Sequence, residues 1–240
     1  MHSAIVIGVG ASQGLGAALC RRFAREGLHV AVGGRTRAKV EKVAAEIAAA
    51  GGSATPVAMD ATIAADVVRI FDAAAQQAGV PELVVYNTGN NQMRPLLEMD
   101  DAFFEEVWRL CCFGGFLTGR EAARRMLGNG GTLIFTGATA SVRARPPFTA
   151  FASAKAALRA LAHGMAREFG PQGLHVGHVV IDGVIGGDLV RGRFPQIIER
   201  LGEDGVLGID AIADAYWMLH TQDRTAWTLE LDVRPYKESF

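Results

Sequence analysis

The feature of this chain that most constrains its fold is an alternation between short, β-branched apolar runs and longer alanine-rich segments of helical period. Such alternation indicates a parallel sheet covered by helices on both faces. We therefore expect an α/β fold with a doubly wound sheet of seven parallel strands. The expected strands are 4–7, 29–33, 54–59, 82–86, 132–136, 175–181 and 227–233, and the expected helices lie near 14–26, 37–50, 63–78, 101–127, 147–169 and 209–220.

The composition points to one domain that binds a small molecule. No linker-like segment divides the 240 residues, so residues 1–240 are expected to form a single domain. Lys and Arg total 24 against 25 Asp and Glu, which favours neither a nucleic-acid nor a membrane partner. Cys20, Cys111 and Cys112 lack metal-ligand spacing and indicate a reduced, cytoplasmic protein. Its first residues do not resemble a secretion signal and no uncharged apolar run reaches roughly 18 residues, so we expect a protein that is neither secreted nor membrane-spanning.

A glycine-rich turn follows the first expected strand in the stretch IGVGASQGLG. Glycine permits close approach of the backbone to a ligand, and the following helix N-terminus attracts a pyrophosphate. The turn therefore predicts a nucleotide-binding site. The alternative is that the glycines only form a tight turn that lets the following helix pack closely. The expected cofactor contacts in this turn are Gly10, Ser12, Gln13, Gly14, Leu15 and Gly16.

The G-x-x-x-G-x-G spacing at this turn resembles that of the short-chain dehydrogenase/reductase family, although Val9 replaces the threonine that usually precedes it. The resemblance covers nearly the whole chain, including the order of its elements. It implies a Rossmann-type sheet, a nicotinamide dinucleotide cofactor and oxidoreductase activity on a small carbonyl or alcohol substrate. These implications can be compared with the residues at each motif of the family.

The end of the second expected strand, GGRTR, bears on which cofactor binds. Gly34 stands at the family's acidic position and Arg35 follows it. An arginine without a neighbouring carboxylate favours a 2′-phosphate. We therefore expect NADP(H) to be preferred, with NAD(H) possible. The alternative is that Arg35 and Arg37 are solvated charges at the start of a helix with Thr36 as its N-cap.

Other positions gain cofactor roles from the resemblance alone. It implies contacts to the adenine, the nicotinamide ribose and the carboxamide from Asp60, Ala61, Asn87, Gly89, Lys155, Gly183 and Ile185. Asp60 has the alternative of forming an Asx turn before the next helix. For Asn87, a structural role that braces the central strands carries more weight than a chemical one.

The family's catalytic residues are incomplete in this chain. Lys155 is retained, but Phe151 stands at the position of the catalytic tyrosine, Ala138 at the serine and Cys111 at the helix asparagine. A phenyl ring neither donates nor accepts the proton that this mechanism requires. The site is therefore expected to be degenerate.

Three residues remain as candidates for catalysis: Lys155, Thr139 and Asp182. Asp182 replaces a proline of the family, and a partly buried carboxyl in its place can act as an acid. The alternatives are that Asp182 is an ordinary turn aspartate and that Lys155 binds only the ribose.

The helices near 101–127 and 147–169 carry small or apolar residues on more than one face, which predicts a homodimer or homotetramer. Two functions fit the sequence. The first is an NADP(H)-dependent oxidoreductase whose proton comes from water, Thr139, Asp182 or the substrate. The second is an inactive nucleotide-binding protein that serves as a sensor, scaffold or partner subunit. We prefer the first, by analogy with the family.

Overall fold

The computed structural model describes residues 2–89 and 91–238, which contain a seven-stranded sheet in the order β3-β2-β1-β4-β5-β6-β7. Every neighbouring pair of strands is parallel. The strands are β1 (Ser3–Ile7), β2 (His29–Gly34), β3 (Ser53–Ala58), β4 (Pro81–Tyr86), β5 (Gly131–Thr136), β6 (Leu174–Ile181) and β7 (Glu230–Val233). The predicted doubly wound parallel sheet is therefore confirmed.

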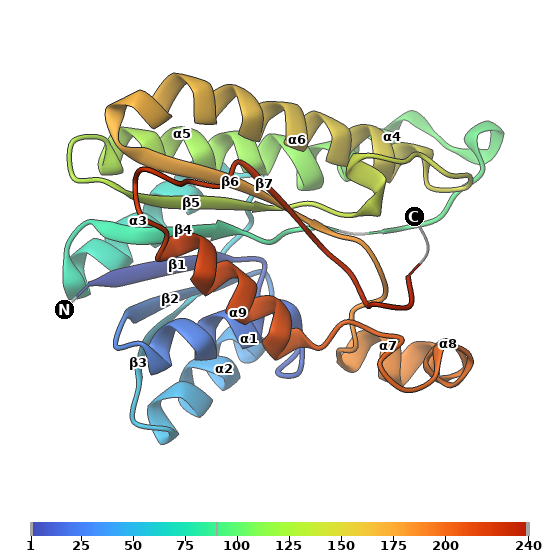
Figure 1. The fold of residues 1–240 in the computed structure, drawn as a ribbon, viewed down its shortest axis with the longest axis horizontal. Coiled ribbons are helices and arrows are strands. Elements are labelled where there is room, and N and C mark those ends of the chain that lie inside the picture. Colours follow the sequence, from blue (N-terminus) through green and yellow to red (C-terminus); the bar gives the residue numbers. More distant parts are fainter. Residues whose placement is uncertain (1, 90, 239–240) are drawn as a thin grey trace.

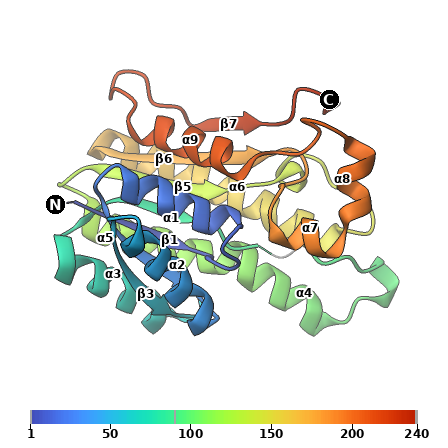
Figure 2. The same cartoon turned by 90° about the horizontal axis from the view of Figure 1, so that it is seen from below.

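Helices cover both faces of the sheet (Figures 1 and 2). One face carries α1 (Leu15–Arg25), α2 (Arg37–Ala49) and α9 (Ile209–His220), and the other carries α3 (Ala64–Ala78), α5 (Gly114–Met126) and α6 (Thr149–Phe169). Side chains alternate between the two layers, so that Val6 of β1 packs in the first and Ile5 in the second. Burial on both faces explains why the central strands read as continuous apolar runs.

The predicted helix near 101–127 is not uniform. It consists of α4 (Asp101–Trp108), a π-helical turn (Arg109–Phe113) and α5. The Tyr86 hydroxyl donates to the Leu110 carbonyl at 2.5 Å, and a Cβ on Gly114 would lie 2.3 Å from that hydroxyl. The buried Tyr86 therefore occupies space beside the helix and binds the Leu110 carbonyl through its hydroxyl. These two effects account for the wider, π-helical turn at this point of the helix.

Two further predictions need correction. The seventh strand begins at Glu230 rather than at 227, because Trp227 stacks on His175 with ring centroids 4.8 Å apart and Thr228 hydrogen-bonds to Gln222. The segment 186–205, in which no helix is expected from the sequence, contains the short helices α7 (Asp188–Arg193) and α8 (Pro195–Leu201). The two helices have only six and seven residues and bury none of them, so they are too short for a helical period to mark them in the sequence.

The winding direction reverses between β1 and β4, which are neighbours in the sheet although α1, β2, α2, β3 and α3 separate them in sequence. In sheets of this type the crevice beyond the carboxyl ends of such strands is where ligands bind. Among the described residues, no helix has the length and apolarity that a membrane crossing requires.

Candidate functional site

The turn that leaves β1 is anchored to β2. The N–H groups of Gly8 and Val9 both donate to the Gly33 carbonyl, at 2.9 and 2.8 Å. Helix α1 starts after Gly14, and its first turn holds no acidic residue. Its N-terminus therefore presents a positive dipole end at the reversal point of the sheet, which suits an anionic group.

Two glycines of this turn differ in what surrounds them. A Cβ on Gly16 would lie 2.8 Å from the Gly8 carbonyl oxygen, so Gly16 permits close packing of α1 on the strand end. A Cβ on Gly10 would meet nothing within 4 Å. Gly10 therefore borders open space, where a ligand could approach the backbone.

The tip of the turn is held from two sides. The Ser12 hydroxyl donates to the Glu46 carboxylate at 2.6 Å, and the Gln13 N–H donates to the Asp188 carboxylate at 3.1 Å. Both partners were missed by sequence reasoning, because they lie 34 and 175 residues away along the chain. These contacts fix the turn between α2 and α7.

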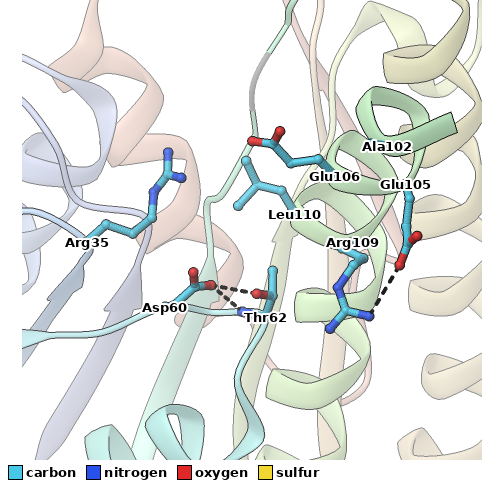
Figure 3. Close-up of a pocket in the computed structure, with 8 residues that line it drawn as sticks. All are labelled: Arg35, Asp60, Thr62, Ala102, Glu105, Glu106, Arg109 and Leu110. Atoms are coloured by element: carbon cyan, nitrogen blue, oxygen red, sulfur yellow. Dashed lines mark hydrogen bonds and ion pairs between the residues drawn. The ribbon is translucent and has the colours of Figure 1, made fainter. Parts of the chain in front are cut away.

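A pocket of about 290 Å³ opens beyond the ends of the neighbouring strands (Figure 3). It lies between the ends of β2 and β3 on one side and α4 with the first residues of the π turn on the other. No interaction joins the Arg35 guanidinium to another residue drawn, whereas Arg109 pairs with Glu105 at 3.9 Å. The pocket is lined by Arg35, Asp60, Thr62, Ala102, Glu105, Glu106, Arg109 and Leu110.

A second hollow of about 50 Å³ shares Arg35 and Leu110 with this pocket and extends to Gly8 and Val9. Together the two spaces form a cleft that runs from Gly8 and Val9, at the start of the glycine turn, to Arg35. Of the predicted contacts, Arg35, Asp60 and Ala61 line this cleft, whereas those from Gly10 to Gly16 line neither space.

Asp60 and Asn87 also have structural partners. Asp60 Oδ1 accepts hydrogen bonds from the N–H and hydroxyl of Thr62 at 2.8 and 2.7 Å, which is the Asx turn considered as an alternative. Asn87 Nδ2 donates to the Gly8 carbonyl at 3.3 Å, and its N–H donates to the Ile7 carbonyl at 2.8 Å. Asn87 therefore ties the ends of β1 and β4 together.

Lys155 is buried beneath the strand ends. Its Nζ donates to the carbonyls of Thr88 at 3.1 Å and Thr136 at 2.8 Å, and burial lowers the pKa of the ammonium below its usual range. A Cβ on Gly89 would lie 3.2 Å from this Nζ. Gly89 and Lys155, which the resemblance both places near the nicotinamide ribose, therefore lie close together.

Apolar groups surround Lys155 where the family's mechanism requires a phenol. The Phe151 ring centre is 5.8 Å from Lys155 Nζ, and Phe151 packs with Cys111 and with the partly buried Ala138. The carbonyl of Leu110, next to Cys111, is taken up by Tyr86. Phe151 and Ala138 carry no exchangeable proton, and the Cys111 thiol and the Tyr86 hydroxyl are fully buried.

Asp182 forms part of a hydrogen-bonded cluster after β6. The Thr139 hydroxyl donates to Asp182 Oδ1 at 2.6 Å, Arg143 lies 3.1 Å from the same oxygen, and Arg234 lies 3.3 Å from Oδ2. Only 3% of Asp182 is exposed. The cluster connects three separate loops. The ion pair of Arg234 with Asp182 could not be predicted from the sequence, because Arg234 follows the last strand and is far from Asp182 along the chain.

Gly183 and Ile185 lie in the adjoining segment. Gly183 has φ +151°, and a Cβ there would meet the Pro235 ring at 2.8 Å. Ile185 forms an isolated parallel bridge with Leu207. Asp188 at the start of α7 joins this segment to Gln13 of the glycine turn.

Comparison with known proteins agrees with this geometry. The family described as short chain dehydrogenase matches residues 4–196. The uncharacterized oxidoreductase YuxG of Bacillus subtilis is 36% identical over 187 residues, which are 76% of this chain and 27% of YuxG. The chain thus spans about a quarter of that relative.

Two solved structures are similar over nearly their full lengths. A short-chain dehydrogenase from Rhodopseudomonas palustris is 38% identical, with a TM-score of 0.81 and coverage of 98% of this chain and 99% of the other. An alcohol dehydrogenase from Thermococcus sibiricus, complexed with 5-hydroxy-NADP, is 26% identical, with a TM-score of 0.86 and coverage of 100% and 98%. This protein belongs to the short-chain dehydrogenase family, whose members are oxidoreductases that bind NAD(P)(H).

Proposed function

We propose that this protein is an NADP(H)-dependent oxidoreductase that acts on a small carbonyl or alcohol with an incomplete set of the family's catalytic residues. The observation that carries the proposal is the cleft that joins Gly8 and Val9, at the start of the glycine turn, to Arg35. A dinucleotide with its pyrophosphate at the N-terminus of α1 would direct its adenosine half toward Arg35.

The preference for NADP(H) is supported by Gly34. A Cβ on this residue would lie 2.2 Å from the Val9 carbonyl oxygen, so a carboxylate that binds the ribose hydroxyls could not be placed there without moving the backbone. Arg35 supplies a positive charge at the same strand end. The solved relative from Thermococcus sibiricus, which was complexed with an NADP derivative, is consistent with this preference.

Arg35→Ala is expected to weaken NADPH binding by about 10-fold to 100-fold, as loss of a charge-assisted hydrogen bond would do, and to leave NADH binding unchanged. Calorimetric titration with both cofactors measures this. Arg37→Ala is the matched control, because Arg37 is 78% exposed and pairs with Glu41 at 3.5 Å. An equal loss of affinity for both cofactors in Arg35→Ala would contradict the assignment of Arg35 to the 2′-phosphate.

When bound, NADPH would supply a hydride to the carbonyl carbon of the substrate. Lys155 would hold the nicotinamide ribose, because its Nζ lies at the strand ends beside Gly89. Because Phe151 supplies no proton, the proton would come from water, either directly or through Thr139, whose hydroxyl proton is donated to Asp182 in this structure and would be replaced from that water after it passed to the substrate. Asp182 would then orient this hydroxyl and anchor the loops around it.

Asp182→Asn tests the anchoring role. Loss of its charged contacts to Arg143 and Arg234 is expected to lower the free energy of unfolding by about 1.5–3 kcal/mol, measured by denaturant titration, and to reduce turnover only partly. Asp232→Asn is the control, because it removes the more exposed partner of Arg234. Complete loss of turnover at unchanged stability would instead identify Asp182 as the proton donor.

We also propose that α4 and α5 contribute to a homodimer or homotetramer. Phe104, Trp108 and Phe116 are 39%, 38% and 38% exposed, and together they place large apolar side chains on the outer side of these helices. Light scattering at micromolar protein is expected to give at least a dimer, and a monomer under these conditions would contradict the proposal.

A further inference from the structure

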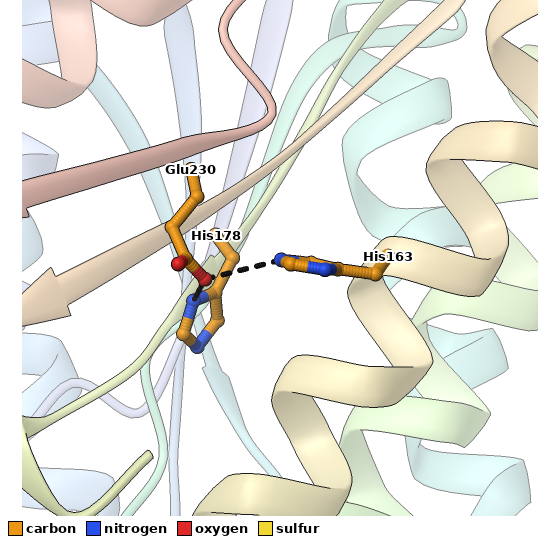
Figure 4. A group of neighbouring side chains, drawn as sticks. All are labelled: His163, His178 and Glu230. Carbon is orange, nitrogen blue, oxygen red and sulfur yellow. Dashed lines mark hydrogen bonds and ion pairs between the residues drawn. The ribbon is translucent and has the colours of Figure 1, made fainter. Parts of the chain in front are cut away.

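A cluster of two histidines and one glutamate lies between α6 and the edge strand β7 (Figure 4). His163 belongs to α6, His178 to β6 and Glu230 to β7. One nitrogen of each ring and one carboxylate oxygen lie within 4.8 Å of one another. None of the three residues lines the cofactor cleft described above.

The fold itself brings these side chains together. His178 and Glu230 are paired in the register of β6 and β7, so their side chains share a face of the sheet. Helix α6 covers that face and directs His163 toward the same carboxylate. The two imidazole rings are 6.3 Å apart and nearly perpendicular, at 81°, so they approach the glutamate from different directions.

One oxygen of Glu230 is crowded with nitrogen atoms. Oε2 lies 3.1 Å from His163 Nε2, 3.0 Å from His178 Nδ1 and 2.6 Å from Arg159 Nε. A carboxylate oxygen offers only about two lone-pair sites, so it cannot accept well from three N–H groups. In the other tautomer, the imidazole nitrogen carries no proton and its lone pair points at the carboxylate oxygen. The two atoms then repel each other unless a cation lies between them. Three hydrogen bonds therefore compete for this one oxygen atom.

The chemistry of the three side chains suits a metal ion, because imidazole nitrogens and carboxylate oxygens are both metal ligands in proteins. The His178 atom that faces Glu230 is Nδ1, at 3.0 Å from Oε2. Nε2 of the same ring lies beside Gly137 and has no hydrogen-bond partner among the described residues. Nε2 would therefore carry the ring proton while Nδ1 binds the metal.

We propose that His163, His178 and Glu230 bind a divalent transition-metal ion of the zinc type. Two imidazoles and a carboxylate are a donor set that zinc uses. Bonds of about 2.0–2.1 Å at tetrahedral angles separate the ligand atoms by about 3.3 Å. The present contacts of 3.0 and 3.1 Å to Glu230 Oε2 are close to this separation, and the two imidazole nitrogens lie within 4.8 Å of each other. The side chains of His163 and Glu230 are 22% and 25% exposed, which leaves access for a water as the fourth ligand.

Arg159 limits the affinity of this site but is compatible with it. Its NH2 group donates to Glu230 Oε1 at 2.7 Å, a bond that can persist while Oε2 binds the metal. The contact of Arg159 Nε with Oε2 must be given up. The positive charges of Arg159 and the nearby Lys155 oppose the ion, so binding is expected to be micromolar and weaker than at structural zinc sites.

The test is calorimetric titration of chelator-treated protein with ZnCl₂ at pH 7.5, together with the visible absorption of the Co²⁺ complex. The wild-type protein is expected to bind one equivalent of Zn²⁺ and to show the d–d bands of four-coordinate Co²⁺. His163→Gln and Glu230→Gln are each expected to bind at least about 10-fold more weakly. His163 is half-buried on a helix surface, so His163→Gln keeps the test valid even if Glu230→Gln is unstable.

His2→Gln is the matched control, because His2 is an exposed histidine that pairs with Glu82 outside the cluster. Its Zn²⁺ affinity and Co²⁺ spectrum are expected to equal those of the wild type. The absence of Zn²⁺ binding by the wild type would overturn the proposal. Equal binding by His163→Gln would overturn it as well, and would leave the cluster as a metal-free clamp between α6 and β7.

Discussion

Gly10→Val is expected to weaken NADPH binding by at least about 100-fold while the protein stays folded. The space beside Gly10 is open for at least 4 Å, and its backbone is not in the left-handed region, so the fold accepts a side chain there. In the proposed complex the same space holds the pyrophosphate, and a valine side chain would prevent its approach to the backbone N–H groups. Calorimetric titration with NADPH measures the loss, and thermal unfolding checks the fold.

Gly164→Val provides the matched control for Gly10→Val. Gly164 also has no atom within 4 Å of a built Cβ, but it lies in α6, where no cofactor contact is expected. Its NADPH affinity is expected to equal that of the wild type. Unchanged NADPH binding in Gly10→Val would show that the glycine turn is not the pyrophosphate site.

The second large effect is expected from Phe151→Tyr combined with Ala138→Ser. This double variant is expected to raise the rate of alcohol oxidation with NADP⁺ by about 10² to 10⁴, the usual contribution of a positioned acid or base. The Phe151 ring centre lies 5.8 Å from Lys155 Nζ, so a hydroxyl on this ring would stand near an ammonium, which favours the ionised phenol. Initial rates with a panel of short secondary alcohols measure the change.

Phe148→Tyr serves as the control for this gain. Phe148 packs against the same apolar cluster as Phe151, so the variant adds a phenol nearby at a different position. It is expected to leave the rate unchanged. An equal gain from Phe148→Tyr, or no gain from the double variant, would contradict the assignment of Phe151 and Ala138 to the family's tyrosine and serine positions.

The rate of the parent protein in the same assay separates the two functions considered from the sequence. A measurable rate that depends on NADP⁺ supports the oxidoreductase and shows that water or Thr139 can serve in place of a phenol. An inert parent with an active double variant would favour a nucleotide-binding protein without hydride transfer. The structure is compatible with the first function because Thr139 lies at the strand ends with its hydroxyl held by Asp182.

The sheet could be predicted from the sequence because burial on both faces leaves continuous apolar runs that end at glycine turns. The π-helical turn could not, because it depends on the contact of Tyr86 with Gly114 across the fold. The short helices α7 and α8 were missed because neither buries a stripe of apolar residues. Periodicity therefore predicts elements that pack on the sheet and not elements that lie outside it.

For the candidate site, the sequence predicted which segments meet but not how their side chains pair. The glycine turn, Arg35 and Asp60 adjoin one cleft because all three follow neighbouring parallel strands. The contact of Ser12 with Glu46 and that of Asp182 with Arg234 join residues with no local signal of their pairing. Such contacts decide whether a polar side chain is available to a ligand. They can be identified only from the three-dimensional structure.

The most direct test of the central claim is calorimetric titration of the wild-type protein with NADPH and, in parallel, with NADH. The account predicts micromolar binding of NADPH and much weaker binding of NADH, because Arg35 is available to a 2′-phosphate while Gly34 leaves no room for an acidic side chain. Equal affinity for the two cofactors would contradict the assigned preference. Absence of binding by either would contradict the proposed NADP(H)-dependent activity itself.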